Sequence, residues 1–154
     1  MTIQIETRAG RCGAICAALL AGLPEWFGIP ASNEAYARDA ENWEVWLAIG
    51  GAPVGLMLLK AHGLGALEIH LLAVERARRR AGIGRALVAA AEARAREEGR
   101  VFLTVKTRGP SIPYAPYEET RRFYEGVGFV GLEEFNEIWG PENPCLFMAK
   151  ALGG

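Results

Sequence analysis

Alternation of apolar and polar residues at the start of the chain, and short apolar runs bounded by turn residues further on, predict β-strands. The predicted strands are residues 2–7, 43–49, 53–61, 66–74 and 101–105, a strand that starts at Phe129, and residues 145–151. Apolar residues recur at helical spacing in four other stretches. The predicted helices are residues 10–21, a helix from Ser32 or Asn33 to Asn42, a long helix that follows residues 79–84 and stops at Gly99, and residues 117–125. The resulting order, β-α-α-β-β-β-α-β-α-β-β, indicates an α/β protein with a mixed sheet.

One buried strand leads directly into the long helix. Residues 66–74 are apolar except for Glu68 and His70, and this composition suits a strand buried on most of its surface. The preceding strand, residues 53–61, is joined to it by a glycine turn, which predicts an antiparallel meander. Residues 101–105 should lie parallel to it, because a helix crosses between the two strands.

The segment between this strand and the helix is rich in arginine and glycine, because residues 79–84 read Arg-Arg-Ala-Gly-Ile-Gly. A helix start offers unpaired backbone N–H groups and a partial positive charge, and glycines let an anion approach them closely. The dinucleotide-binding fingerprint needs a third glycine where Leu87 stands, and the Gly-Lys-Ser/Thr end of a nucleoside triphosphate loop is missing. The segment therefore predicts an anion site of another kind. The alternative is a plain strand–turn–helix whose glycines only serve packing.

This segment resembles the acyl-CoA loop of the GNAT superfamily of N-acetyltransferases, whose pattern is Arg/Gln-x-x-Gly-x-Gly/Ala after a strand that ends in Ala-Val or a similar pair. Here Ala73 and Val74 end the strand, and residues 79–84 form the loop. Residues 123–129, Phe-Tyr-Glu-Gly-Val-Gly-Phe, are similar to the family's aromatic-Tyr-x-x-x-Gly-Phe element. The two elements follow each other in the family's order, and the resemblance covers residues 66–131 by motif.

The resemblance implies a GNAT-like acyl-CoA N-acyltransferase fold in a single domain, residues 1–154. It implies transfer of an acetyl group from acetyl-CoA to a primary amine by direct attack in a ternary complex, with a small-molecule or peptide amine as acceptor. The residues that it places at the coenzyme are Leu72, Ala73, Val74, Arg79, Arg80, Ala81, Gly82, Ile83, Gly84, Arg85 and Tyr117. Those that it places in one wall of the acceptor site are Trp26, Phe27 and Tyr36, for which a position in the core is the alternative.

The resemblance also suggests which residues move protons. In some family members a glutamate in a Glu-Ile-x-x-x-Ala-Val context acts as general base, and here that residue is Glu68. Burial at a crevice in the sheet should raise its pKa and suit it to this role. A structural Glu68 would instead pair with an arginine across the strands, and His70 is the reserve base. Tyr124 matches the family tyrosine that protonates the coenzyme thiolate, and backbone N–H groups near Leu72 would polarise the thioester carbonyl.

One position departs from the family pattern. Members commonly have Asn six residues before the aromatic residue that precedes the tyrosine, where it binds the pantetheine arm, and Ala or Ser three residues later. This chain has Tyr117 and Thr120 there. The contact of Tyr117 with the coenzyme therefore rests on position alone, and the acceptor site is expected to have a different shape nearby.

Charge is unevenly distributed, although the formal net charge is only −1 at pH 7. Residues 66–108 contain ten basic and five acidic side chains, whereas the rest of the chain contains seven and thirteen. This division suits a protein that holds a polyanion at its centre and a cationic amine at its edges. Because interleaved aromatic residues and nucleic-acid motifs are missing, no nucleic-acid partner is expected.

The three cysteines, Cys12, Cys16 and Cys145, are an odd number without paired spacing, which is typical of buried thiols in a reducing, cytoplasmic compartment. The chain has only two histidines, and neither has a partner at metal-ligand spacing, so no metal is expected. The apolar run at residues 12–23 is too short to cross a bilayer, and no membrane partner is expected. Monomer and homodimer are both compatible with the sequence.

Two functions of other classes fit some of the same features. An acyl-CoA-binding sensor or interaction module would keep the loop and lack turnover. An arginine-rich nucleic-acid binder would use the basic cluster alone. No Cys or Ser has a partner that suggests an acyl-enzyme, so a transferase of this kind would use direct attack.

Overall fold

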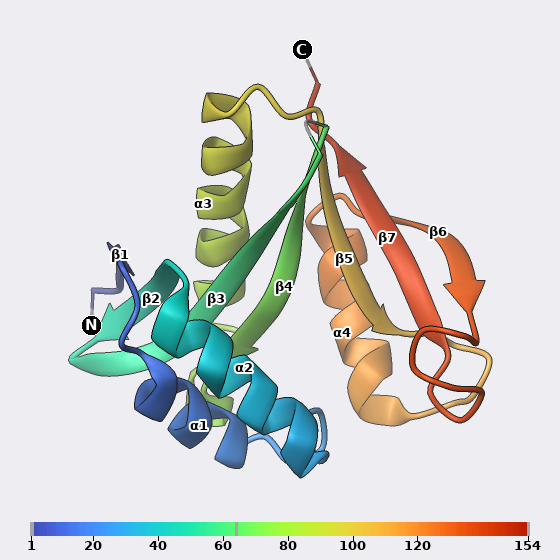
Figure 1. The fold of residues 1–154 in the computed structure, drawn as a ribbon, viewed down its shortest axis with the longest axis horizontal. Coiled ribbons are helices and arrows are strands. Elements are labelled where there is room, and N and C mark those ends of the chain that lie inside the picture. The colour runs from blue at the N-terminus through green and yellow to red at the C-terminus, as the bar shows by residue number, and fades with distance from the viewer. Residues whose placement is uncertain (1, 64, 154) are drawn as a thin grey trace. The chain divides into compact units, whose positions relative to one another are not determined.

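The computed structural model describes residues 2–63 and 65–153 of the chain. Its elements, in chain order, are β1 (Gln4–Arg8), α1 (Gly13–Ala21), α2 (Pro30–Asn42), β2 (Val45–Gly50), β3 (Ala52–His62), β4 (Ala66–Val74), the 3-10 turn η1 (Arg76–Arg78), α3 (Ile83–Glu97), β5 (Phe102–Arg108), α4 (Ala115–Gly126), β6 (Val130–Phe135) and β7 (Cys145–Ala151) (Figure 1). The described residues thus contain seven strands and four α-helices in the predicted order.

The chain divides into two compact units. The first comprises Met1–Lys60 and His70–Ala91, and the second comprises Ala61–Ile69 and Glu92–Gly154. Hydrogen-bonded strands follow the order β1-β2-β3-β4 in the first unit and β4-β5-β7-β6 in the second, so that β4 contributes to both.

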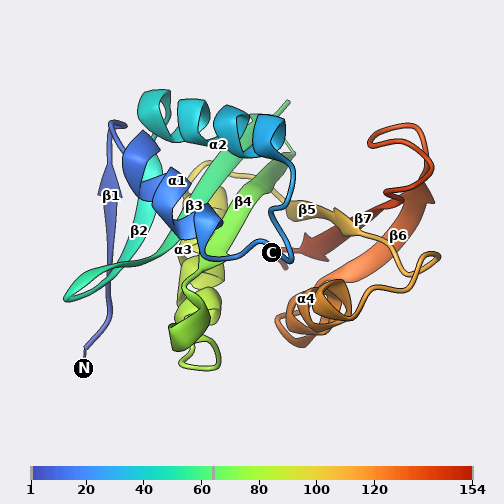
Figure 2. The same ribbon diagram turned by 90° about the horizontal axis from the view of Figure 1, so that it is seen from below.

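The first unit is a set of strands with helices on both faces. β1 pairs antiparallel with β2, and β2 pairs antiparallel with β3. Figure 2 shows α1 and α2 on one face of these strands and the start of α3 on the other. The core between α1, α2 and the strands consists of buried side chains: Cys12, Cys16, Leu20, Leu23, Ala40, Val45, Leu47, Leu56, Leu58, Leu71 and Ala73.

Gly55 of β3 determines how closely the start of α3 packs on the strands. A Cβ atom at Gly55 would lie 3.1 Å from Cγ2 of Ile83 and 3.3 Å from Cδ1 of Leu87. Both side chains are buried. The absence of a side chain at Gly55 therefore lets the first turn of α3 sit directly against the strand, which positions the arginine and glycine loop before it.

The first helix begins three residues later than predicted. Gly10 and Arg11 have φ angles of +127° and +61°, and a left-handed backbone does not continue into a right-handed helix. The Arg11 N–H donates to the carbonyl of Glu41 at 2.9 Å, which ties this bend to the end of α2. α1 accordingly starts at Gly13.

The predicted cap of the second helix was wrong. α2 starts at Pro30, with Ile29 in the N-cap position, so neither Ser32 nor Asn33 caps it. Proline suits this first turn because its φ is fixed and it lacks the N–H that would go unpaired there. Asn33 instead donates its Nδ2 to the carbonyl of Phe27 at 2.8 Å, which closes the loop before the helix.

The second unit combines parallel and antiparallel pairing. β4 pairs parallel with β5, with Glu68 opposite Thr104, which confirms the predicted crossover through a helix. β5 pairs antiparallel with β7, and β7 pairs antiparallel with β6. β5 extends to Arg108, three residues beyond the predicted strand, and α4 begins at Ala115, two residues before the predicted helix.

The end of α3 confirms the stop predicted from Gly99. Gly99 has a φ of +73°, its N–H donates to the carbonyl of Arg96 at 3.0 Å, and the Arg100 N–H donates to the carbonyl of Ala95 at 2.9 Å. This pair of bonds is a Schellman motif, in which the left-handed residue satisfies carbonyls that the helix leaves open.

Candidate active site

The predicted anion loop is a left-handed turn that opens α3. Arg80 and Gly82 have φ angles of +66° and +80°. The Ala86 N–H donates to the carbonyl of Gly82 at 3.0 Å, and the helix begins at Ile83. A Cβ atom at Gly82 would meet nothing within 4 Å, so the space beside this residue is open. By helix geometry, the N–H groups of the first turn have no intrahelical acceptor and are directed at this end of the helix.

Trp26 contacts two arginines, Arg79 of this loop and Arg76 of the 3-10 turn η1 before it. The guanidinium carbon of Arg79 lies 4.0 Å from the centroid of the Trp26 ring, and that of Arg76 lies 5.5 Å from it. Arg76 also forms an ion pair with Glu25, and the hydrogen bond from Arg76 lowers the pKa of the Glu25 carboxyl. Trp26, expected in the wall of the acceptor site, therefore contacts the predicted coenzyme loop.

The backbone between β4 and the loop is held by the neighbouring strand. The Glu75 N–H donates to the carbonyl of Val54 at 2.8 Å, at the end of the β4 run. Leu71 and Ala73 are buried in the core of the first unit, whereas Leu72 and Val74 alternate with them and are partly exposed. This alternation leaves Leu72 and Val74, two of the predicted coenzyme contacts, partly accessible.

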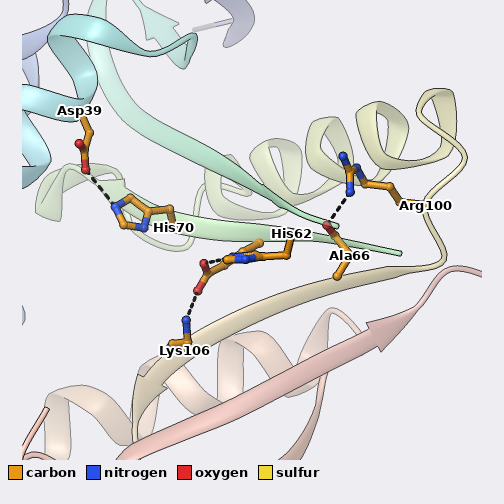
Figure 3. A network of polar contacts seen from close by, with 7 residues as sticks. Asp39, His62, Ala66, His70, Arg100 and Lys106 are labelled. Atoms are coloured by element: carbon orange, nitrogen blue, oxygen red, sulfur yellow. Dashed lines mark hydrogen bonds and ion pairs between the residues drawn. The ribbon is translucent and has the colours of Figure 1, made fainter. Parts of the chain in front are cut away.

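Phe27 and Tyr36 belong to a cluster of rings around His70. Tyr36 lies 6.2 Å from Phe27 and 5.3 Å from His70 between ring centroids, and Trp43 lies 5.0 Å from His70. Nε2 of His70 lies 3.1 Å from Oδ2 of Asp39, as Figure 3 shows. The pairing of His70 with Asp39 was not predicted, but Tyr36, Asp39 and Trp43 follow each other at helical spacing, which is a signal that the sequence contains.

Glu68 is a buried carboxylate with a histidine on one oxygen and a lysine on the other. Its side chain is 6% exposed; Oε1 lies 2.8 Å from Nε2 of His62, and Oε2 lies 3.1 Å from Nζ of Lys106 (Figure 3). Burial raises the pKa of Glu68, but the hydrogen bonds from His62 and Lys106 outweigh it, and the pKa lies below its ordinary value. The expectation of a raised pKa was therefore wrong, and the partners are a lysine and a histidine, whereas the structural alternative had named an arginine.

Tyr124 lies at the end of α4, where the second family element predicts it. Its side chain is 5% exposed, and its ring packs edge-on against Phe123 at 5.2 Å and Phe129 at 5.4 Å between centroids. The Phe129 N–H donates to the Tyr124 carbonyl at 2.9 Å, and Gly128 between them has a φ of +103°. The element is thus a helix end that buries two aromatic rings and fixes the direction of the tyrosine side chain.

Tyr117 lies in the first turns of α4, next to the proline-rich loop. Its ring centroid lies 6.0 Å from that of Tyr114, and the guanidinium carbon of Arg108 lies 5.1 Å from the Tyr114 ring. Thr120 Oγ1 donates to the carbonyl of Pro116 at 3.3 Å, so the hydrogen of this hydroxyl is bound within the helix. Tyr117 is partly exposed, which leaves part of its surface for a ligand.

The cysteines do not have the environment of nucleophiles. All three thiols are unpaired and buried, and burial raises the pKa of Cys16 to about 11. Between residues 2 and 63 and between 65 and 153, no group of three or more His, Cys, Asp or Glu side chains is arranged to hold a metal ion. The helices in these same ranges are all too short or too polar to cross a bilayer.

Solved structures with the same fold are acetyltransferases by name. A protein from Desulfovibrio desulfuricans assigned to the GNAT family matches with a TM-score of 0.83 and 17% identity, over 99% of this chain and 100% of that one. An aminoglycoside 6'-N-acetyltransferase complexed with coenzyme A matches with a TM-score of 0.77 and 22% identity, over 100% and 98% of the two chains. The ribosomal-protein-S18-alanine N-acetyltransferase of Escherichia coli matches with a TM-score of 0.73 and 17% identity, over 99% and 96%.

Sequence comparison identifies the family directly. No curated protein matches the sequence significantly. The family model described as the acetyltransferase (GNAT) domain matches residues 41–131, a range that includes both motifs and more than half of the chain. The mixed sheet with four helices agrees with the fold of the solved GNAT proteins. The chain therefore belongs to the GNAT family of acetyltransferases.

Proposed function

We propose that this protein transfers the acetyl group of acetyl-CoA to a primary amine, by direct attack of the amine in a ternary complex. The observation that carries the proposal is the left-handed turn at Gly82, which has open space beside it and lies in the same loop as Arg79. A diphosphate needs this combination of backbone N–H groups, positive charge and free approach.

The loop residues would hold the coenzyme by its phosphates. The N–H groups of Ile83, Gly84 and Arg85 lie in the first turn of α3, and the Arg79 guanidinium is oriented by the Trp26 ring. Bound acetyl-CoA would supply an acyl group activated as a thioester. Backbone N–H groups near Leu72 would polarise the thioester carbonyl, because β4 carries partly exposed residues there.

Tyr124 is proposed as the acid that protonates the departing thiolate. Its ring is fixed between two aromatic neighbours, so little rotational freedom is lost when the hydroxyl engages a ligand. Replacement of Tyr124 by Phe should lower turnover roughly tenfold to a thousandfold, while the affinity for acetyl-CoA stays near normal. Unchanged turnover would exclude the acid role.

The base that removes a proton from the amine is proposed to lie on β4, where Glu68 was predicted and His70 was the reserve. The acceptor is proposed to be a small-molecule or peptide amine, with Phe27 and Tyr36 in the wall of its site. Structural relatives are named for acceptors of both kinds, an aminoglycoside and a protein alanine. That range supports an amine acceptor in general and selects no single compound.

The decisive experiment replaces Gly82 by Ala. The substitution places a methyl group in the open space beside this residue and should weaken acetyl-CoA binding roughly tenfold to a hundredfold, because hydrogen bonds to charged groups contribute about 1.5–3 kcal/mol each. Gly99→Ala is the matched control: Gly99 lies at the other end of α3, with a φ of +73° and the same open surroundings. Both variants should lose similar stability, but only Gly82→Ala should lose affinity in calorimetry. Equal affinities would overturn the site.

Turnover distinguishes the enzyme from a coenzyme-binding sensor. Release of the coenzyme thiol from acetyl-CoA, measured across a panel of small and peptide amines, should rise above the amine-free rate for at least one acceptor. Binding of acetyl-CoA without release across the panel would favour the sensor. Binding of oligonucleotides in place of the coenzyme would favour the third class of function.

A further inference from the structure

Arg108 is the last residue of β5, and three contacts within the second unit hold it in place. Nη1 of Arg121 donates to the Arg108 carbonyl at 2.7 Å, and the Gly109 N–H donates to the Pro144 carbonyl at 2.8 Å. The guanidinium carbon of Arg108 lies 5.1 Å from the centroid of the Tyr114 ring. The backbone and the side chain of Arg108 are therefore both positioned by the fold.

The guanidinium of Arg108 has only neutral partners, and its hydrogen bonds are long. Nη1 donates to Oδ1 of Asn143 and Nη2 donates to the carbonyl of Glu142, each at 3.4 Å, beyond the range of about 2.7–3.2 Å that is usual for such bonds. Nε is buried and has no hydrogen-bond partner. Within residues 2–63 and 65–153, this partly buried side chain forms no ion pair. A partly buried charge without a counter-ion is unfavourable.

Arg100, in the same unit, shows the environment of an arginine whose partners all belong to the chain. Its Nε donates to Oε1 of Glu98 at 2.6 Å, and its Nη1 donates to the carbonyls of Gly63 and Ala66 at 3.0 Å and 2.9 Å. Arg100 thus has a carboxylate and short hydrogen bonds, whereas Arg108 has neither. We infer that the anion that completes the environment of Arg108 comes from a ligand.

The position of Arg108 in the sheet is one at which ligands bind. β5 runs parallel to β4, and Arg108 is at its carboxyl end, where ligands of open α/β sheets are typically found. The connection after β5, residues 109–114, and the connection between β6 and β7, residues 136–144, lie at the same end of the second unit (Figure 1). They carry Ile112 and Trp139, which are 37% and 43% exposed. These connections therefore offer apolar surface to the body of a ligand.

We propose that Arg108 is the centre of a carboxylate-binding site in the second unit, and that the ligand is a monocarboxylate with an apolar body. The planar guanidinium matches the two oxygens of a carboxylate, so Nη1 and Nη2 exchange their long bonds for two short, charge-assisted ones. One cation matches one negative charge. The carboxylate of Glu134 packs against Gly109, the next residue, and disfavours a doubly charged phosphate there. The proposal concerns binding alone and does not rest on the proposed function.

A titration of the whole protein without acetyl-CoA tests the site with benzoate and with benzamide, which has the same ring but no charge. The wild type should bind benzoate at least about tenfold more tightly, because hydrogen bonds between charged groups are the stronger ones. Arg108→Gln should abolish this preference, whereas Arg122→Gln, at an exposed arginine of α4, should keep it. Equal dissociation constants for the two ligands in the wild type, or an unchanged preference in Arg108→Gln, would overturn the proposal.

Two further measurements keep the proposal testable if Arg108→Gln folds poorly. Arg108→Lys keeps the charge but loses the planar pair of N–H groups, so it should keep only part of the preference for benzoate. A lysine variant as selective as the wild type would count against the paired geometry. In the wild type, the NMR signals of the Arg108 Nε–H and the Gly109 N–H should shift with benzoate and not with benzamide. Shifts confined to residues of the first unit would overturn the assignment.

The carboxylate has two possible sources, the amine acceptor itself or a separate ligand, and transfer assays distinguish them. Phenylalanine and phenylalaninamide are compared as acceptors with acetyl-CoA. A higher kcat/KM for phenylalanine that is lost in Arg108→Gln would assign the carboxylate to the acceptor. Benzoate binding at Arg108 without such a preference would assign it to a separate ligand, and either result keeps the site. A protein that transfers no acetyl group would remove the proposed function, whereas loss of the benzoate preference would remove this inference alone.

Discussion

Two histidine–carboxylate pairs involve β4, and they place the same two chemical groups in opposite environments. In the second unit the carboxylate is on the strand: Glu68 is 6% exposed, and its partner His62 is 43% exposed. In the first unit the histidine is on the strand: His70 and Asp39 are 25% and 27% exposed. The contact distances differ by only 0.3 Å, 2.8 Å against 3.1 Å.

The difference between the pairs lies in how much each group depends on its partner. Glu68 is cut off from water, so its charge needs both His62 and Lys106. His70 and Asp39 keep contact with water, so either one tolerates a change in the charge of the other. The comparison therefore separates a buried, structural pair, Glu68 with His62, from a partly solvated pair, His70 with Asp39.

The largest expected effect is on the structural pair. Lys106→Met should lower the free energy of unfolding by about 2–3 kcal/mol, because Glu68 stays buried with one oxygen unpaired. Urea denaturation at pH 7 measures this. The double variant Glu68→Gln, Lys106→Met should recover part of the loss, since it removes the unpaired charge. A Lys106→Met protein as stable as the wild type would mean that water reaches Glu68, and the two pairs would then be alike.

The sequence was sufficient to predict the order of helices and strands, but not the side chains that pair with Glu68 and His70. β4 (Ala66–Val74) and β7 (Cys145–Ala151) were predicted with their observed bounds, because glycine or proline precedes each apolar run. The family motifs identified the loop and the position of Tyr124. The direction of the Glu68 pKa was wrong because it depends on register: Glu68 pairs with Thr104 across the parallel strands, which brings Lys106, two residues further on, within reach. Register between strands separated by a helix is not encoded in local pattern.

The contacts of Asp39 and Trp26 were not predictable either, because their partners lie far away in the sequence. Asp39 is 31 residues from His70 in sequence, and Trp26 is separated from Arg79 by the whole of α2 and three strands. Only the packing of α1 and α2 on the strands of the first unit creates these contacts. Tyr36, Asp39 and Trp43 follow each other at helical spacing, but this spacing does not identify the strand residue that they meet.

The next largest effect concerns the contact between the Arg79 guanidinium and the Trp26 ring. Trp26→Leu should weaken acetyl-CoA binding roughly fivefold to thirtyfold, because the guanidinium of Arg79 loses its cation–π contact. kcat at saturating coenzyme should stay near the wild-type value. Trp26→Phe, which keeps an aromatic ring, should lose less, and Trp139→Leu, at an exposed tryptophan of the second unit, should lose nothing. A lowered kcat with normal affinity would instead place Trp26 in the acceptor site.

Acid pH should weaken the structural pair by a smaller amount. Because the pKa of Glu68 is lower in the folded protein than in the unfolded chain, its ionised form contributes stability that is complete above the ordinary carboxyl pKa of about 4.3. This contribution is lost as the pH falls through the lower folded-state pKa. Thermal unfolding between pH 7 and pH 3 should therefore show the difference in stability between wild type and Glu68→Gln shrink as the pH falls. A constant difference would mean that Glu68 titrates alike in both states.

The smallest expected effect is on the partly solvated pair, His70 with Asp39. Asp39→Asn should change the free energy of unfolding by less than about 1 kcal/mol, because both partners are partly solvated and asparagine is still able to accept the hydrogen bond from His70. Urea denaturation at pH 7 measures this change. A loss of stability as large as that in Lys106→Met would mean that both pairs depend on their partners alike.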